Sequence, residues 1–273
     1  MRRVGVLTGG GDAPGLNAVI RALVKRLQAE NIEVIGFRNG YKGLVQGEFQ
    51  VLHSQAISGI LPRGGTILGT SNRDNPFNFH GEDRFEDCVR HVKALGLECI
   101  VVIGGEGSLA VGAICWQRGL PVIGVPKTID NDLYATDQTF GYDTAVSIAT
   151  EALDRLHTTA ESHHRIMVLE VMGRYAGWIA VASGLAGGAD AILIPEIPFT
   201  LEAVAAKVNQ RREMGKPFSI IVVAEGARTP EGELLVRQTV PGSHDPKRLG
   251  GIGQYVAGRL EAMTGLESRV TVL

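Results

Sequence analysis

Three glycine-rich, polar segments of this chain each follow a short apolar run. They are residues 9–15, 104–108 and 126–132. Glycines at such points let backbone N–H groups and helix N-termini approach an anion closely. A single glycine after a strand can serve simply as a tight turn, but three such loops together favour a site for phosphate groups.

Two common phosphate-binding motifs fit this sequence poorly. No segment matches the Walker A pattern, which needs a lysine and a hydroxyl residue at fixed spacing after its glycines. The dinucleotide fingerprint fails in the first loop, where Pro14 replaces the third glycine, although Gly105-x-Gly107-x-x-Ala110 matches a relaxed form. The strand after that match ends at residues 125–127 without the acid that binds ribose. An NAD-dependent oxidoreductase is therefore a distant alternative.

The third loop holds two carboxylates, Asp130 and Asp132, beside Lys127 and Thr128. In an extended chain, residues two apart point the same way, so both carboxylates are expected to face one reacting centre. One could accept the proton of an attacking hydroxyl while another acid helps to hold magnesium. The alternative is a pair of turn-forming aspartates that cap the loop backbone. A turn does not require the neighbouring cation and hydroxyl, which favours a catalytic loop.

Strand, loop and helix alternate along the chain, and the strands are almost continuously apolar. This pattern is typical of parallel sheets covered by helices. We predict an α/β fold of two doubly wound, mainly parallel-sheet domains with helices on both faces, divided near Gly141 into residues 1–141 and 142–273. The expected strands are 4–8, 32–37, 98–103, 121–125, 165–171, 191–195, 218–224 and 268–273. The expected helices are 18–29, capped by Asn17, one following 104–108, and 85–95, 142–161, 177–185, 201–214 and 252–263.

Composition excludes several classes of protein. Among 273 residues, 44% are hydrophobic and 21% charged, which is ordinary for globular domains. The 27 basic and 29 acidic residues lack the basic excess of a nucleic-acid binder. The apolar runs are too short to span a membrane, and the N-terminus shows no signal-peptide pattern. The odd number of cysteines, three, fits reduced thiols, so we expect a cytoplasmic protein that binds neither nucleic acid nor membrane.

Four segments, taken in order, resemble the signatures of the phosphofructokinases. They are Gly10-Gly11-Asp12-Ala13-Pro14-Gly15-x-Asn17, Gly104–Ser108, Pro126–Asp132 and Glu170–Arg174. The resemblance runs from Arg3 to the last residue. It implies magnesium-dependent transfer of the ATP γ-phosphoryl to the 1-hydroxyl of fructose 6-phosphate, a glycolytic step giving fructose 1,6-bisphosphate and ADP.

The resemblance also implies roles for single residues. Asp130 is the expected general base, and Arg174 the arginine that stabilises the transferring phosphoryl group. Lys127 and Thr128 are expected to take part in catalysis, and Thr128 and Asp132 to contact the substrate or transition state.

The donor is expected to bind in the first domain, 1–141. The residues that the resemblance implies for donor binding are Gly10, Gly11, Arg73, Glu106, Gly107 and Ser108. Glu106 is also the expected ligand of Mg²⁺. Most family members carry Asp at that position, and Glu reaches one methylene further.

The sugar phosphate is expected to bind in the second domain, 142–273. The resemblance places Met172, Gly173, Arg174 and Glu225 around the sugar. Arg165 and Arg269 resemble the pair that binds the 6-phosphate from a neighbouring subunit, a task suited to guanidinium groups. The resemblance therefore implies a homo-oligomer, a tetramer, with shared sugar sites.

Two residues bear on the phosphoryl donor. Family members that use pyrophosphate typically carry Asp at the position of Gly107, where a carboxylate would clash with the α-phosphate of a nucleotide. They also carry Lys at the position of Lys127, where common ATP users have Gly. We expect ATP, because Gly107 leaves room for it, and retain a pyrophosphate-dependent phosphotransferase as the alternative.

The C-terminus raises another alternative. In the family the chain continues past Thr271–Leu273 into a loop with a further His and Arg for the substrate, and then into helices that return to the first domain. That return segment is absent from this sequence. The second alternative is therefore an inactive module that binds a sugar phosphate or nucleotide.

Overall fold

The computed structural model describes residues 2–240 and 245–273, which group into two compact units. The first unit comprises residues 2–128 and 133–141, and the second comprises 129–132, 142–240 and 245–273. Residues 129–132 thus group with the second unit, although they precede the boundary expected at 141. We describe each unit by itself.

The first unit contains a six-stranded sheet in the order β3-β2-β1-β4-β5-β6. All neighbouring strands are parallel except β3, which runs antiparallel to β2. Its strands are β1 (Arg3–Gly9), β2 (Glu33–Phe37), β3 (Phe49–Val51), β4 (Leu97–Gly104), β5 (Val122–Thr128) and β6 (Phe140–Gly141). Its helices are α1 (Leu16–Gln28), α2 (Tyr41–Gln46), α3 (Phe85–Leu95), α4 (Glu106–Gln117) and the 3₁₀ turn η1 (Pro76–Asn78).

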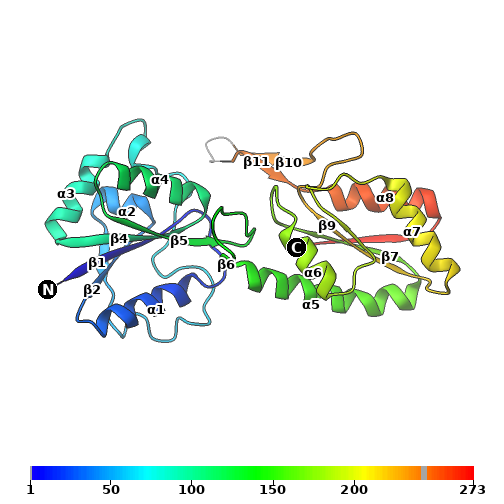
Figure 1. The fold of residues 1–273 in the computed structure, drawn as a ribbon, viewed down its shortest axis with the longest axis horizontal. Coiled ribbons are helices and arrows are strands. Elements are labelled where there is room, and N and C mark those ends of the chain that lie inside the picture. The colour runs from blue at the N-terminus through cyan, green and yellow to red at the C-terminus, as the bar shows by residue number, and fades with distance from the viewer. Residues whose placement is uncertain (1, 241–244) are drawn as a thin grey trace. The chain divides into compact units, whose positions relative to one another are not determined.

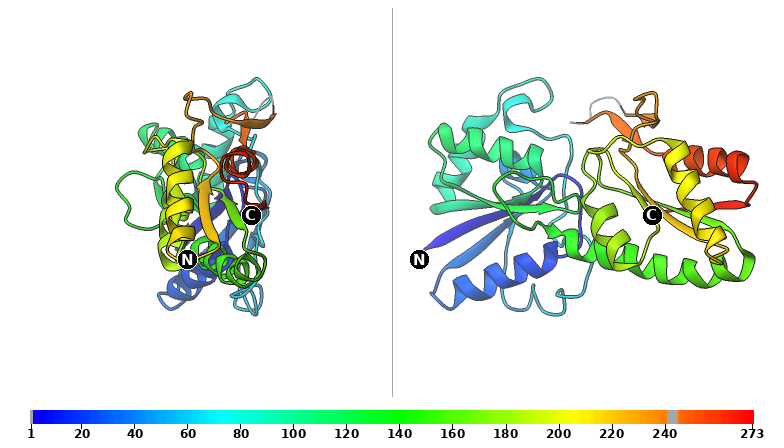
Figure 2. Two further views of the ribbon diagram at one scale, coloured as in Figure 1. Left: turned by 90° about the vertical axis from the view of Figure 1, so that its right-hand side faces the viewer. Right: turned by 45° about the vertical axis from the view of Figure 1, so that its right-hand side comes forward.

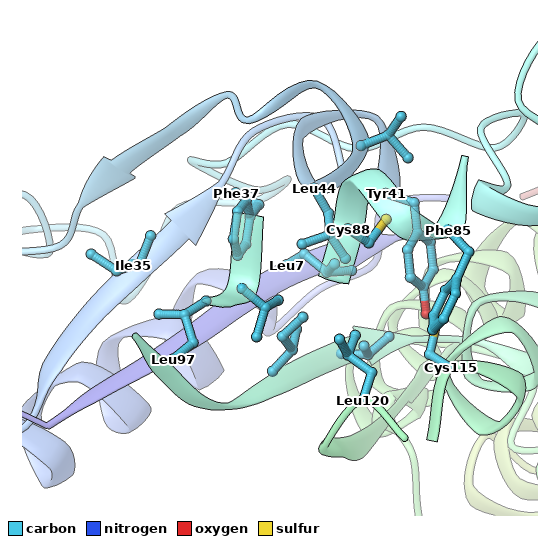
Figure 3. Packing of buried hydrophobic residues seen from close by; sticks show 14 of the residues in the cluster. Leu7, Ile35, Phe37, Tyr41, Leu44, Phe85, Cys88, Leu97, Cys115 and Leu120 are labelled. Atoms are coloured by element: carbon cyan, nitrogen blue, oxygen red, sulfur yellow. The ribbon is translucent and has the colours of Figure 1, made fainter. Parts of the chain in front are cut away.

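Helices cover both faces of this sheet (Figure 1), because successive strand residues point to opposite sides. Val4 and Val6 of β1 pack in a core with α1. Leu7 of the same strand points the other way, into a core with α2, α3 and α4 that includes Phe37 and Cys88 (Figure 3). The alternation of β1 therefore serves two separate hydrophobic layers.

The second unit contains a fully parallel four-stranded sheet in the order β12-β7-β9-β8. One face packs against α5 and α6 and the other against α7 and α8, as the views in Figures 1 and 2 show. The strands are β7 (Ile166–Val171), β8 (Ala191–Leu193), β9 (Ser219–Ala224) and β12 (Ser268–Val272). The helices are α5 (Tyr142–His163), α6 (Trp178–Ala186), α7 (Leu201–Glu213) and α8 (Ile252–Thr264).

The predicted fold class is confirmed: both units are α/β, with mainly parallel sheets and helices on both faces. Several elements lie outside the prediction. They are α2, β3, β6 and an antiparallel hairpin of β10 (Val236–Thr239) and β11 (Lys247–Leu249). None of the helices in the described part of the chain combines the length and the hydrophobicity of a membrane-spanning segment.

The predicted role of Asn17 as a helix cap is wrong. Helix α1 begins at Leu16, with Gly15 as its N-cap, so Asn17 lies inside the first turn. The buried Asn17 side chain instead accepts a hydrogen bond from the Ile67 N–H at 2.8 Å and donates one to the Arg63 carbonyl at 3.0 Å. Asn17 thus fastens the loop around residues 63–67 to α1.

Both sheets place polar loops at the carboxyl ends of their central strands. In the first sheet, β2, the next strand along the chain, lies on one side of β1. Strand β4 lies on the other side of β1, so the strand order changes direction there. Parallel sheets bind ligands at such a change in strand order, beyond the carboxyl ends. The loop after β1 and the N-terminus of α4 after β4 therefore form the expected ligand edge of the first unit.

Candidate active site

The close approach of two loops at this edge depends on glycine. A Cβ atom on Gly9 would lie 2.5 Å from the Ser108 Oγ, and one on Gly104 would lie 2.5 Å from the Ser108 Cβ. Both distances are far below a normal contact between these atoms. Glycine at the ends of β1 and β4 therefore lets Ser108 and the start of α4 sit directly against the first loop.

Backbone hydrogen bonds hold the first loop in place. Gly10 has a positive φ of 80°. Its N–H donates to the Ser71 carbonyl at 3.2 Å, and its carbonyl accepts from the Thr70 hydroxyl at 2.5 Å. Gly11 is next to open space, since a Cβ atom there would meet no atom within 4 Å. Arg73, exposed in the adjoining segment, donates its N–H to the Ser71 hydroxyl at 3.3 Å.

Lys127 places a cation beside the same loop. It lies near the end of β5, with 4% of its surface exposed, and its ammonium group donates to the Gly11 carbonyl. Its neighbour Thr128 is partly exposed, and the Thr128 carbonyl accepts from the Thr139 hydroxyl at 2.7 Å. The structure thus brings Lys127 together with the loop that contains Gly10 and Gly11.

Helix α4 begins beside this loop with Glu106, Gly107 and Ser108 in its first turn. Its N-cap is Gly105, which supplies no side-chain cap, so the first N–H groups remain available to an anion. The buried Tyr41 hydroxyl donates to the Ser108 carbonyl at 2.8 Å and fixes the start of the helix. Burial raises the pKa of the Tyr41 phenol well above its usual value, so this donor stays protonated.

The residues expected to bind the donor fit a magnesium ion that would be shared with phosphate. Among residues 2–240 and 245–273, no group of three or more His, Cys, Asp or Glu side chains forms a complete metal cage. Glu106 is an exposed carboxylate at a helix N-terminus. Mg²⁺ is commonly held by one or two carboxylates, with water and substrate phosphates completing its shell. Glu106 would supply that carboxylate.

In the second unit, Asp130 is held near the carboxyl end of β7. Its neighbour Ile129 packs against the hydrophobic core shared by α5, α6 and one face of the sheet. Asp130 is 8% exposed, whereas Asp132 is exposed. Asn131 between them has a left-handed φ of 54°. The left-handed residue interrupts the extended chain on which the prediction of a shared carboxylate direction rests, and that shared direction stays a prediction.

Arg174, in the loop after β7, lies between two carboxylates. Its Nε is 4.0 Å from the Asp130 Oδ2, and its Nη1 is 3.3 Å from the Asp245 Oδ2. The Arg174 side chain is 43% exposed, so the guanidinium is also accessible from solvent. The expected general base, Asp130, and the arginine expected to bind the phosphoryl group thus lie side by side in one unit.

The backbone around Arg174 is tightly constrained. Arg174 has a left-handed φ of 51°, and Gly173 has a φ of 140°, which favours glycine. The Glu225 Oε1 accepts the Arg174 N–H at 3.0 Å. A Cβ atom on Gly226 would lie 1.8 Å from the Arg174 carbonyl oxygen, so the two backbones meet without a side chain between them.

Glu225 follows β9, and the pKa of its carboxyl group differs from the ordinary value. Burial raises its pKa, and the N–H groups of Arg174 and Gly173 act in the opposite direction. Met172, 47% exposed, follows β7 directly. The structure therefore gathers Asp130, Met172, Gly173, Arg174 and Glu225 at the carboxyl end of the second sheet.

Arg165 and Arg269 lie at the opposite end of that sheet. Arg165 immediately precedes β7, and Arg269 is the second residue of β12. The two meet through Glu267, whose carboxylate is 2.6 Å from the Arg165 Nε and 2.5 Å from the Arg269 Nη2. Arg165 and Arg269 therefore lie close together through their shared contact with Glu267. Within their own unit they do not form a cluster with Arg174.

Sequence reasoning missed residues that support the site. Tyr41, Tyr175 and Asp245 each make hydrogen bonds to site residues or their neighbours. Tyr175 was within reach of prediction, because it adjoins Arg174. Asp245 was not, because it belongs to a polar segment beside a hairpin that has no apolar alternation.

Comparison with known proteins shows the protein family to which the chain belongs. The family described as Phosphofructokinase matches residues 3–273, and the chain belongs to this family.

The names of individual relatives specify two different phosphoryl donors. The chain is 53% identical to the "ATP-dependent 6-phosphofructokinase 2" of Clostridium perfringens, in an alignment covering 100% of this chain and 78% of that protein. It is 52% identical to a "Pyrophosphate--fructose 6-phosphate 1-phosphotransferase" of Streptomyces coelicolor, covering 99% and 79%. A solved phosphofructokinase from Saccharomyces cerevisiae matches with a TM-score of 0.83 and 29% identity, over 100% of this chain and 38% of the yeast chain.

The raised pKa of Glu225 predicts a pH-dependent effect of Glu225→Gln. The folded chain holds the Glu225 proton more tightly than the unfolded chain, so this group's contribution to stability is present below its ordinary pKa of 4.5 and is lost as pH rises through the raised value. The unfolding free energy of Glu225→Gln relative to the native chain should therefore increase from about pH 4 to about pH 7. Denaturant unfolding across this range measures it.

Glu213→Gln, at an exposed position of α7, controls for the loss of one carboxylate. A Glu225→Gln difference that stays constant across the pH range would contradict the prediction.

Proposed function

We propose that this chain catalyses magnesium-dependent transfer of the ATP γ-phosphoryl to the 1-hydroxyl of fructose 6-phosphate, the glycolytic reaction that gives fructose 1,6-bisphosphate and ADP. The observation that carries the proposal is the placement of Asp130, 8% exposed, with its Oδ2 4.0 Å from the Arg174 Nε. Membership of the phosphofructokinase family supports it.

Each residue of the site has a task in this reaction. Asp130 accepts the proton of the 1-hydroxyl, so that the oxygen can attack phosphorus. Arg174 stabilises the negative charge of the transferring group. Glu225, Met172, Gly173 and Asp132 contact the sugar.

The donor phosphates have their own set of residues. Gly10 and Gly11, the α4 N-terminus with Gly107 and Ser108, and Arg73 bind the donor, while Lys127 and Thr128 assist transfer. Glu106 would hold Mg²⁺, which when bound neutralises charge on the donor phosphates.

Gly107 supports ATP over pyrophosphate as the donor. It lies in the first turn of α4, at the helix N-terminus expected to face phosphate, where an aspartate would add bulk and negative charge. Lys127 favours the second candidate, a pyrophosphate-dependent phosphotransferase, because family members that use pyrophosphate typically carry Lys at this position, where common ATP users have Gly. Relatives named for either donor are almost equally similar, at 53% and 52% identity.

The positions of Arg165 and Arg269 support a homo-oligomer. They lie at the opposite end of the second sheet from Arg174, so a sugar bound beside Arg174 would take its 6-phosphate contacts from another subunit. The third candidate is a module that binds ligands without turnover. A coupled assay of fructose 1,6-bisphosphate formation distinguishes it from the first two candidates, because only those two form the product.

Asp130→Asn should abolish most turnover. Without the base, kcat should fall about 10²- to 10⁴-fold. The dissociation constant for fructose 6-phosphate should change little, because the amide keeps the shape of the side chain. The measurement is the coupled assay with ATP and magnesium, beside calorimetric binding of the sugar phosphate.

Asp154→Asn removes an exposed carboxylate from α5 and serves as the matched control. Nearly intact turnover in Asp130→Asn would show that another group is the base. Sugar binding without turnover in the native chain would favour the third candidate.

The donor is decided by kcat/KM for ATP and for pyrophosphate at saturating fructose 6-phosphate and magnesium. We expect the ATP value to be higher, and Gly107→Asp to abolish ATP use because its carboxylate repels the α-phosphate. Gly107→Ala adds a methyl group without charge and separates bulk from repulsion. A pyrophosphate value about tenfold above the ATP value, a difference of about 1.4 kcal/mol in transition-state stabilisation, would overturn the assignment.

Shared sugar sites predict complementation between two impaired variants. Arg269→Ala should raise the KM for fructose 6-phosphate with a smaller effect on kcat, since it removes a binding contact. Mixed oligomers of Arg269→Ala and Asp130→Asn subunits contain sites with both an intact base and an intact arginine, so activity at low substrate should exceed the sum of the separate variants. A fully active monomer in sedimentation experiments would refute shared sites.

A further inference from the structure

The hairpin of β10 and β11 carries a carboxylate to the site. Asp245 lies two residues before β11, and the two strands pair from Val236 with Leu249 to Thr239 with Lys247. The Lys247 N–H donates to the Asp245 Oδ1 at 3.0 Å, and the Arg248 Nη1 donates to the Asp245 carbonyl at 3.1 Å. Contacts with the first two residues of β11 therefore fix Asp245 and orient its carboxylate.

The other carboxylate oxygen faces the loop after β7. The Asp245 Oδ2 accepts from the Arg174 Nη1 at 3.3 Å and from the Tyr175 hydroxyl at 3.1 Å. The Asp245 side chain is 15% exposed, against 43% for Arg174. The guanidinium is thus anchored at its Nη1 by a charge-assisted hydrogen bond to a carboxylate that is less exposed than the arginine itself.

Arg174 is consequently held at both ends. Its backbone is fixed by the hydrogen bond to Glu225 and by the close approach of Gly226. Its Nη1 is held by Asp245, while its Nε stands 4.0 Å from Asp130. An arginine side chain loses rotamer entropy when it is ordered, and a preformed anchor removes part of that cost from the reaction.

The geometry points to Asp245 as a positioning residue that holds the Arg174 guanidinium ready for the transferring phosphoryl group, an inference that rests on the function proposed above.

A double-mutant cycle tests this inference. Asp245→Asn keeps the shape of the side chain and removes its charge, so kcat should fall about 10- to 100-fold, while the dissociation constant for fructose 6-phosphate changes less than about threefold. In an Arg174→Ala background the same substitution should change kcat less than about twofold, because its target is gone. An equal loss in both backgrounds, or no loss in the native background, would overturn the inference.

Further variants keep the test decisive. Tyr175→Phe removes the second hydrogen bond to the Asp245 Oδ2 and leaves the ion pair, so its effect should be smaller than that of Asp245→Asn. Asp154→Asn controls for the loss of one carboxylate. If Asp245→Asn does not fold, Asp245→Glu retains the charge and displaces it by one methylene; wild-type activity in that variant would count against a positional role.

Nuclear magnetic resonance of the Arg174 Nε–H group gives a readout that needs no turnover. Its signal, assigned by its loss in Arg174→Ala, should show restricted motion in the native chain and averaged motion in Asp245→Asn. An unchanged signal would overturn the inference. If the native chain shows no turnover with ATP or pyrophosphate, the proposed function fails, while this measurement still decides whether Asp245 holds Arg174.

Discussion

The site residues of both units depend on places where a glycine allows a close contact that a Cβ atom would block. In the first unit Gly9 and Gly104 allow the Ser108 side chain to pack against the ends of β1 and β4, and in the second unit Gly226 allows close contact with the Arg174 carbonyl. Each contact joins loops that leave neighbouring parallel strands. Parallel strands deliver their loops to one edge, and the missing Cβ atoms let these loops pack tightly enough to orient charged groups.

Much of the fold could be predicted because its central strands are buried on both faces. The apolar run of residues 99–103 predicts a strand and lies within β4, and helix α3 has the predicted bounds 85–95. Strand β10 could not be predicted this way, since all four of its residues are exposed and carry no alternation. The short elements α2 and β3 lie in a region with many turn signals, where tertiary packing decides the local structure.

The sequence predicts where the site residues lie along the chain better than it predicts which way their side chains point. Loops after buried strands could be located from the sequence, because glycine and apolar residues mark them. The direction of each side chain could not. Asp130 is buried and Asp132 is exposed on either side of the left-handed Asn131, and Asn17 bonds to a distant loop rather than to its own helix. The Asn17 contact joins segments that are far apart in the chain, which a local sequence pattern does not reveal.

The carboxylate of Glu267 already occupies both arginines at the far end of the second sheet. A phosphate that takes over the hydrogen bonds of the Arg165 Nε and the Arg269 Nη2 displaces an anion that is part of the protein. Binding becomes an exchange between two anions, and its free energy is the difference between two ion-pair energies, less the cost of exposing Glu267 to water. Such an exchange favours a dianionic ligand over a monoanionic one, because only the former brings more charge than the carboxylate it replaces.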